Sequence, residues 1–290
     1  MQQTMNLFSG QMVALGREVT PLLITFNEAP NLQRVLPKLA WAKRIVVIDS
    51  GSTDATLDML TQYPQVEVVS RPFTDFASQC NFGLRLIKTP WVLSLDADYE
   101  LSDKLIADLG RAVQSGEKAG FEVRFVYRIF GRPLRGSLYP PRVVLYLVKL
   151  AKYRNEGHGH RVVIDGSVGQ LDGVIYHDDR KPLSRWLTSQ LRYADKEAAH
   201  LLSASPSELS RTDRLRRTGW PAPILIVVYT LFVKGCVFDG WAGWFYVLQR
   251  LCAEVLLALE IIDRKLSAGN KLPRPAPAQD SGTIAKPAAQ

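Results

Sequence analysis

The sequence predicts an α/β fold in which a mostly parallel sheet is flanked by helices. From residue 19 onward, short apolar or β-branched runs alternate with helix-like stretches, as expected for parallel strands joined by crossover helices. The run at residues 44–49 (RIVVID) is apolar without alternation, which is typical of a strand covered on both faces. The 290 residues suffice for one sizeable domain, or for one domain with an appendage.

The first predicted strand, residues 19–25, contains Pro21, which we expect near a sheet edge or at the start of the strand. Residues 27–30 open the next helix. A polar turn at residues 49–54 follows the second strand, and a helix then continues to about Gln62. The remaining elements of this half are a strand at 66–69, a helix at 77–87, a strand at 91–95 and a helix capped by Ser102.

The second half of the chain has a different character. Mixed strands and long loops are predicted for residues 120–180, and a helix for residues 185–202. Five segments result: a flexible N-terminal lead (1–17), a main domain (18–180), a basic helical connector (181–219), apolar helices (220–265) and a disordered tail (266–290) rich in Pro, Ala, Gly and Lys.

Polar side chains follow three of the predicted strands, at residues 25–28 (TFNE), 49–52 (DSGS) and 96–98 (DAD). Because the carboxyl ends of parallel strands meet at one edge of a sheet, where ligands bind, we expect these clusters to converge. The sequence therefore predicts a functional site at this edge.

The stretch VLSLDAD at residues 92–98 ends a buried strand on two carboxylates. Asp96 and Asp98 would repel each other unless a cation relieved them. A hard cation, Mg²⁺ or Mn²⁺, would do so, accept phosphate oxygens on its other side and neutralise a departing diphosphate. A DxD pair alone is a weak signal, since a solvated turn gives the same pattern, so the prediction depends on the strand that precedes it.

Four motifs, in this order and spacing, resemble family 2 glycosyltransferases with the GT-A fold. They are Thr25-x-Asn27-Glu28, residues 49–56 (DSGSTDAT), Gln79-x-Asn81 and Leu95-Asp96-Ala97-Asp98. The chain looks most like the bacterial branch that includes lipopolysaccharide core glucosyltransferases, over residues 19–180 and again at residues 234–240. The resemblance implies a nucleotide-sugar half (18–119), an acceptor half (120–180) and inverting transfer from a UDP-sugar to a lipid-linked or lipopolysaccharide glycan.

The resemblance also implies roles for single residues. Asp98 would bind the metal, Asp96 would contact the ribose or donor sugar, and Asp49 would accept from the imide of a uracil base. The other residues implied to bind the nucleotide-sugar are Thr25, Asn27, Glu28, Ser52, Asp54, Gln79 and Asn81. Two alternatives stay open: Asp54 can equally cap the helix it opens, and Gln79 and Asn81 can be surface amides of a helix.

The second half departs from the branch at one functional position. The branch has a His-Glu pair where this chain reads His160-Arg161, so the carboxylate most readily cast as general base is missing. An inverting transfer needs such a base to remove the acceptor hydroxyl proton, and the candidates are Glu156, Asp165 and Asp172. We expect Glu156 and His160 in the catalytic set.

Histidines and arginines of the second half are expected to border the acceptor or the diphosphate. They are His160, His177, Arg142 and Arg161, with Arg180 as a further cation that could hold phosphate. A second metal site made of His158, His160 and His177 is the alternative that we do not favour, because loop histidines more often serve as hydrogen-bonding residues.

Residues 220–262 are the most apolar part of the chain, and no run of uninterrupted apolar residues is long enough for a conventional membrane span. They form either a helical hairpin packed on the body or on a partner chain, or helices that lie in the headgroup layer of a membrane. The aromatic cluster and four arginines at residues 211–217 favour the membrane. We therefore expect a peripheral enzyme at the cytoplasmic face of the bacterial inner membrane, and leave a homo-oligomer open.

The net charge of +8 suits an anionic partner. We do not expect nucleic-acid binding, because the arginines gather beside an apolar segment and not along an aromatic-interleaved face. Three scattered cysteines fit a reducing compartment. The rival functions are a nucleotidyltransferase, for which a Gly-rich phosphate loop after the first strand is missing, and an inactive nucleotide-binding scaffold.

Overall fold

The structure is a computed structural model that describes residues 12–156 and 159–269, with only the backbone of residues 156, 159 and 160. Residues 12–18 are helical and bury Leu15 in the core, so the predicted flexible lead reaches too far. The sequence did not predict this helix, because a single buried leucine gives no helical periodicity of apolar residues. Residues 266–269 likewise belong to the last helix and not to the tail. Residues 1–11 and 270–290 lie outside the described residues.

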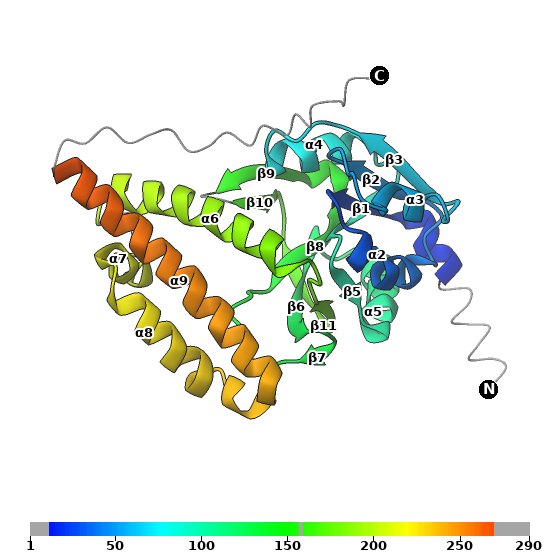
Figure 1. The fold of residues 1–290 in the computed structure, drawn as a ribbon. Coiled ribbons are helices and arrows are strands. Elements are labelled where there is room, and N and C mark those ends of the chain that lie inside the picture. Colours follow the sequence, from blue (N-terminus) through cyan, green and yellow to red (C-terminus); the bar gives the residue numbers. More distant parts are fainter. Residues whose placement is uncertain (1–11, 157–158, 270–290) are drawn as a thin grey trace, which may run out of the picture.

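A nine-stranded sheet forms the centre of the main domain, in the order β3-β2-β1-β4-β8-β6-β11-β5, with β7 paired to β6 (Figure 1). Its strands are β1 Val19–Thr25, β2 Ile45–Asp49, β3 Val66–Ser70, β4 Trp91–Asp96, β5 Tyr99–Leu101, β6 Gly120–Ile129, β7 Arg132–Pro133, β8 Arg142–Leu147 and β11 Val168–His177. The strands β9 (Ala151–Glu156) and β10 (Gly159–Ile164) form a separate antiparallel ribbon.

The sheet is mixed, which corrects the prediction of a mostly parallel one. β1 to β4 are parallel to one another, as expected. β8 runs antiparallel to both β4 and β6, and β5 runs antiparallel to β11. The reason is that residues 120–147 turn back without a crossover helix, and short connections join antiparallel strands. Strands from both sides of residue 120 share this sheet, so the two predicted halves form one continuous structure.

Pro21 lies in an interior strand at a place where that strand has only one partner. β1 pairs with β4 from Val19 onward, but its pairing with β2 begins at Leu22. The missing N–H of Pro21 therefore falls at the start of the strand, as the sequence predicts, although β1 is not an edge strand.

Four helices follow the strands of the first half: α2 (Ala29–Val35), α3 (Thr56–Leu60), α4 (Phe76–Leu86) and α5 (Asp103–Ser115). Ser102 caps α5, as predicted, by accepting a hydrogen bond from the backbone N–H of Leu105 at 3.2 Å. Asp75 caps α4 in the same way at the N–H of Ser78.

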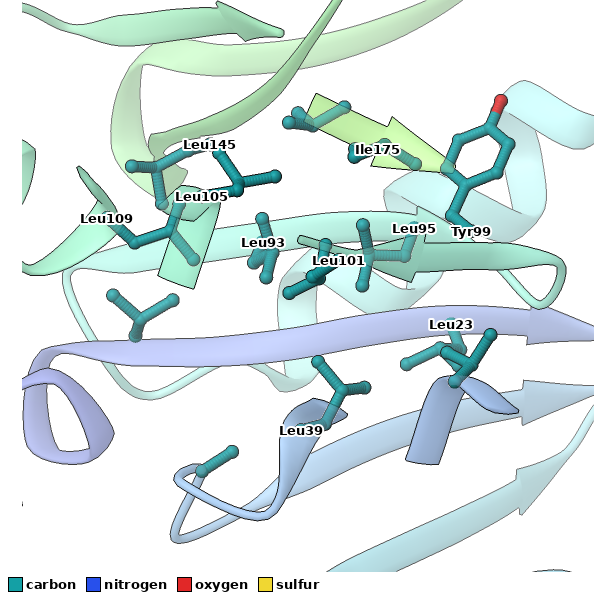
Figure 2. Packing of buried hydrophobic residues seen from close by; sticks show 14 of the residues in the cluster. Leu23, Leu39, Leu93, Leu95, Tyr99, Leu101, Leu105, Leu109, Leu145 and Ile175 are labelled. Atoms are coloured by element: carbon teal, nitrogen blue, oxygen red, sulfur yellow. The ribbon is translucent and has the colours of Figure 1, made fainter. Parts of the chain in front are cut away.

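Hydrophobic cores lie on both faces of the sheet, because neighbouring strand residues point to opposite faces. Leu23 and Leu93 belong to a cluster with side chains of α2, of the 3-10 helix η1 (Leu36–Leu39) and of α5, part of which Figure 2 shows. Leu22 and Val92 belong to the second cluster, with Cys80 and Leu84 of α4. Burial on both faces explains why these strands read as continuous apolar runs.

The C-terminal part is helical and projects from the sheet (Figure 1). It comprises α6 (Leu183–Ser203), α7 (Arg211–Thr218), α8 (Pro221–Val228), the π-helix η3 (Tyr229–Val233), the 3-10 helix η4 (Cys236–Asp239) and α9 (Gly240–Gly269). α9 packs along both α6 and α8, which confirms helices in the predicted connector and apolar segment. Among the described residues no single helix could span a membrane; Pro221–Val233 and Cys236–Gly269, bent by 71°, meet that criterion only as a pair.

Candidate active site

The turn after β2 is held by Asp49, which is buried. Its Oδ1 accepts hydrogen bonds from the backbone N–H groups of Gly51 (2.9 Å) and Ser52 (2.8 Å). Its Oδ2 accepts from the hydroxyls of Thr25 (2.8 Å) and Ser52 (2.5 Å). Asp49 therefore fixes the turn against the end of β1, and the predicted contact with a nucleobase stays a prediction.

Asn27 connects the ends of β1 and β2. Its backbone is in the left-handed region (φ 55°), which asparagine tolerates better than most residues. Its Oδ1 accepts from the backbone N–H of Thr53 at 2.7 Å, and its own N–H donates to Ser52 Oγ at 2.8 Å. Asp54 accepts from the N–H of Thr56, the first residue of α3, at 3.0 Å. The N-cap residue is Ala55 and no side chain caps the helix, so Asp54 is not its cap.

Gln79 is buried next to the end of β3. Its Nε2 donates to Ser50 Oγ and to the carbonyl of Arg71, both at 3.0 Å, and the Arg71 guanidinium donates to Gln79 Oε1. Gln79 is thus no surface amide. Arg71 was missed in the sequence, although it directly follows β3 and its position after a strand was the available signal.

Asn81 joins α4 to the β9–β10 ribbon. Its Nδ2 donates to the backbone carbonyl of Tyr153 and its Oδ1 accepts from the N–H of Tyr153, both at 2.9 Å. This two-way pairing is structural, and a contact of Asn81 with nucleoside or sugar stays a prediction.

The carboxylate pair at the end of β4 divides between two environments. Asp96 is the last residue of β4, whereas Asp98 is buried and directs Oδ2 to Nε2 of His177 at a distance of 2.9 Å. Burial alone would raise the pKa of Asp98, but the His177 charge and hydrogen bond, together with Lys181, lower it to about 2. Burial lowers the pKa of His177, and Asp98 outweighs that effect and raises it.

Three tyrosines surround the His177 ring. The centroids of Tyr99, Tyr127 and Tyr139 lie 5.5, 4.8 and 4.6 Å from the imidazole centroid. The Tyr99 and Tyr139 hydroxyls are hydrogen-bonded to each other. Nδ1 of His177 is buried without a hydrogen-bond partner among the described residues, so Nε2 and Asp98 form the polar end of this aromatic pocket.

A buried ion pair lies beside it. Lys181 Nζ is 2.6 Å from Glu28 Oε1, and Asn31 Nδ2 donates to Glu28 Oε2 at 3.0 Å. Burial raises the pKa of Glu28 to about 7, although Lys181 counteracts it. Sequence reasoning missed Lys181 as a site residue, because only the fold brings it to Glu28.

The arginines that the sequence predicts beside the acceptor or the diphosphate lie in three different environments. Arg142 opens β8 and stacks over Tyr139, 5.0 Å from the ring centroid, so it borders the tyrosine pocket. Arg161 is exposed on β10, opposite Arg154 of the ribbon. Arg180 donates to the buried carboxylate of Asp178 and so holds the loop after β11.

The carboxylates predicted as candidates for the general base also lie in different parts of the structure. The side chain of Asp172 is exposed at the β11 irregularity and pairs with Lys104 of α5 at 3.3 Å, which removes it from the predicted role. Asp165 lies after β10, with its N–H bonded to the carbonyl of Leu150. The side chains of Glu156 and His160, and all of His158, lie outside the described residues. Within the described parts of the chain no group of three or more His, Cys, Asp or Glu side chains is arranged to hold a metal ion.

Comparisons with known proteins bear on the family. The sequence model described as "Glycosyl transferase family 2" matches residues 22–166, half of the chain. The lipopolysaccharide core biosynthesis glycosyltransferase LpsC of Rhizobium meliloti is 30% identical over 196 residues, 62% of this chain and 70% of that protein. An uncharacterized glycosyltransferase of Rickettsia bellii is 27% identical over 147 residues, and the matched region spans half of that relative's length.

A solved structure, S. aureus TarS 1-349 in complex with UDP-GlcNAc, covers 86% of this chain and 92% of its own at 13% identity and a TM-score of 0.47. The resemblance to family 2 glycosyltransferases seen in the sequence is confirmed by the family match. The chain belongs to glycosyl transferase family 2 and is a glycosyltransferase.

Proposed function

We propose that the enzyme transfers a sugar, with inversion, from a UDP-sugar to a lipid-linked or lipopolysaccharide glycan at the cytoplasmic face of the bacterial inner membrane. The observation that carries the reaction is the pairing of Asp98 Oδ2 with His177 Nε2 at 2.9 Å, at the edge of the sheet where Thr25 and Asp49 also lie. The name of the LpsC relative supports an envelope glycan as acceptor.

Asp98 and His177 would hold one Mg²⁺ or Mn²⁺ ion beside the donor diphosphate. A carboxylate oxygen and an imidazole nitrogen are ordinary ligands for such ions, and 2.9 Å is a spacing that two ligands of one cation can have. The His177 ring cannot turn freely among three tyrosines, so Nε2 stays directed at Asp98. When bound, the cation would neutralise charge on the departing diphosphate. We therefore propose His177 as a metal ligand, whereas the sequence had suggested that it borders the acceptor or the diphosphate.

The chain's own groups would supply the rest of the chemistry. Lys181, held by Glu28, adds a positive charge near Asp98, and Arg142 adds another beside Tyr139. In the transfer the acceptor hydroxyl oxygen forms a bond to the sugar C1, the bond from C1 to the diphosphate breaks, and a base takes the hydroxyl proton. Glu156 stays our candidate for that base, since Asp172 is paired elsewhere and exposed.

The experiment is a UDP-release assay with Mn²⁺ on UDP-sugars, using the wild type, Asp98→Ala, His177→Ala and Asp172→Ala. We expect release by the wild type and by Asp172→Ala, and none by the other two. Thermal stabilisation by UDP only when Mn²⁺ is present would support the metal role. Full activity in a metal-chelating buffer would contradict it, and an absence of release with every UDP-sugar and acceptor would support the inactive scaffold.

A further inference from the structure

The bend between α8 and α9 exposes a group of large apolar side chains. We call them the bend patch: Tyr229, Phe232, Val233, Phe238, Trp241 and Trp244, with between 42% and 70% of each exposed. Gly235 and Gly240, both with positive φ, form the turns that bring η3, η4 and the start of α9 together. Exposed apolar groups of this size mark contact surfaces in folded proteins.

The opposite side of the bend is fully packed. Leu231, Cys236, Tyr246 and Val247 are buried against Ile129 and Leu134 of the main domain. The bend is therefore fixed to the body by one face, and the bend patch is what remains on the other. Packing in the hydrophobic core therefore does not explain the exposed aromatic rings of the bend patch.

Cations lie directly at the aromatic rings of the bend patch. The Arg132 guanidinium is 5.7 Å from the Trp241 ring centroid, that of Arg135 is 5.4 Å from Phe238, and Lys234 Nζ is 5.7 Å from Tyr229. Asp239 is the single acidic residue between positions 220 and 253. Its side chain is 5% exposed and pairs with Arg135, so the surface of the bend carries net positive charge.

The basic cluster at residues 211–217 contributes less to this charge than the sequence suggests. Arg216 pairs with Glu197 of α6 at 3.0 Å and with Glu254 of α9 at 3.1 Å, so it holds the helices together. The carbonyl of Ala204 accepts from Arg217. The cations that accompany the apolar surface are instead Arg132, Arg135 and Lys234.

We infer that the bend patch docks on an anionic lipid surface, with its aromatic side chains in the headgroup layer and the three cations on lipid phosphates. Aromatic rings and basic residues together are the signature of such docking. A second copy of the chain fits less well, because a two-fold contact through this patch would bring like charges together. The inference rests on the proposed function in one respect: docking would bring the active site close to a lipid-linked acceptor.

The position of the bend suits that purpose. Tyr246, on the packed face, lies 5.1 Å from Tyr127 between ring centroids, and Tyr127 lies 4.8 Å from His177. Two ring contacts thus separate the proposed lipid-facing bend from Asp98 and His177. A glycan on a lipid carrier would need to extend only a short way from the membrane.

The test is co-sedimentation of the full chain with vesicles of phosphatidylcholine, alone or mixed with anionic phosphatidylglycerol. We expect binding to the mixed vesicles. The pair Phe232→Ser/Phe238→Ser should weaken it by at least about tenfold, since two apolar side chains no longer enter the interface. The pair Arg132→Gln/Lys234→Gln should weaken binding to the anionic vesicles by about fivefold for each charge, with little change on phosphatidylcholine.

Val68→Ser and Lys149→Gln, on exposed positions of β3 and before β9, are the matched controls, and circular dichroism checks that every variant folds. Equal binding by all variants, or none by the wild type, would overturn the inference. So would a dimer in solution that Phe232→Ser/Phe238→Ser converts to a monomer, since the patch would then belong to a second copy. UDP release without vesicles tests the proposed reaction separately.

Discussion

Nε2 of His177 and Oδ2 of Asp98 lie 2.9 Å apart, and their side chains are only 13% and 11% exposed. They lie 79 residues apart in the sequence, Asp98 just after β4 and His177 at the end of β11. The imidazole and Lys181 now supply the positive charge that the buried carboxylate favours, and a divalent cation held by both side chains would take the place of the imidazole proton.

Replacing Asp98 by Asn should therefore abolish metal use with little change of shape. We expect kcat to fall by at least about a hundredfold, because a bound cation stabilises the leaving group by several kcal/mol. Isothermal titration with Mn²⁺ should show the loss of binding directly. Asp172→Asn, at an exposed carboxylate, should behave as the wild type; equal Mn²⁺ affinity in both variants would refute the assignment.

Glu28 should make stability depend on pH. Its pKa is raised to about 7 by burial, so the folded chain keeps a proton that the unfolded chain releases near pH 4.5. The stability it contributes is present below pH 4.5 and is lost as the pH rises through 7, on the order of 3 kcal/mol in total. Urea unfolding should show the wild type losing stability relative to Glu28→Gln between pH 5 and 8. The control, Glu117→Gln at an exposed position, should give a constant difference.

Tyr246 should act on the site through a loop. Its hydroxyl accepts a hydrogen bond from the backbone N–H of Leu138 at 2.9 Å, and the next residue, Tyr139, packs on His177. Tyr246→Phe should reduce the free energy of unfolding by about 1 kcal/mol, because that N–H loses its partner. We also expect weaker Mn²⁺ binding, which a purely structural role would leave unchanged. Tyr63→Phe, near α3, is the control.

Gly173 should tolerate no side chain. A Cβ there would lie 2.3 Å from the Cα and 2.4 Å from the N of Leu105 in α5, and backbone atoms cannot rotate away. Gly173→Ala should cost ~3 kcal/mol of stability, measured by chemical denaturation. Gly269→Ala, where a Cβ meets nothing within 4 Å, should leave stability unchanged. A stable Gly173→Ala variant would mean that α5 packs less closely on β11 than described.

Sequence reasoning located β1 to β4, the turn at Asp49 and the pair of Asp96 and Asp98, because each depends on neighbours in the chain. It missed β5 and placed no individual strand between residues 120 and 180. It could not find the tyrosines around His177 or the pairing of Lys181 with Glu28. These contacts join residues that are far apart in the sequence, and a tyrosine or lysine carries no local signal of its eventual partner. The reversed direction of β8 was missed for the same reason, since its apolar run reads alike in either direction.

β5 is three residues long and pairs with the last residues of β11, so that Tyr99 stands opposite His177. The spacing of the two proposed ligands is therefore set by backbone pairing at the far margin of the sheet. One inserted residue between Asp98 and Leu101 would shift Asp98 relative to the pairing of β5 with β11 and so move its carboxylate away from His177. The imidazole itself would keep its direction, because the pairing of β11 with β6 also holds His177. Among relatives, we expect the length of this short segment to be less free to vary than its composition.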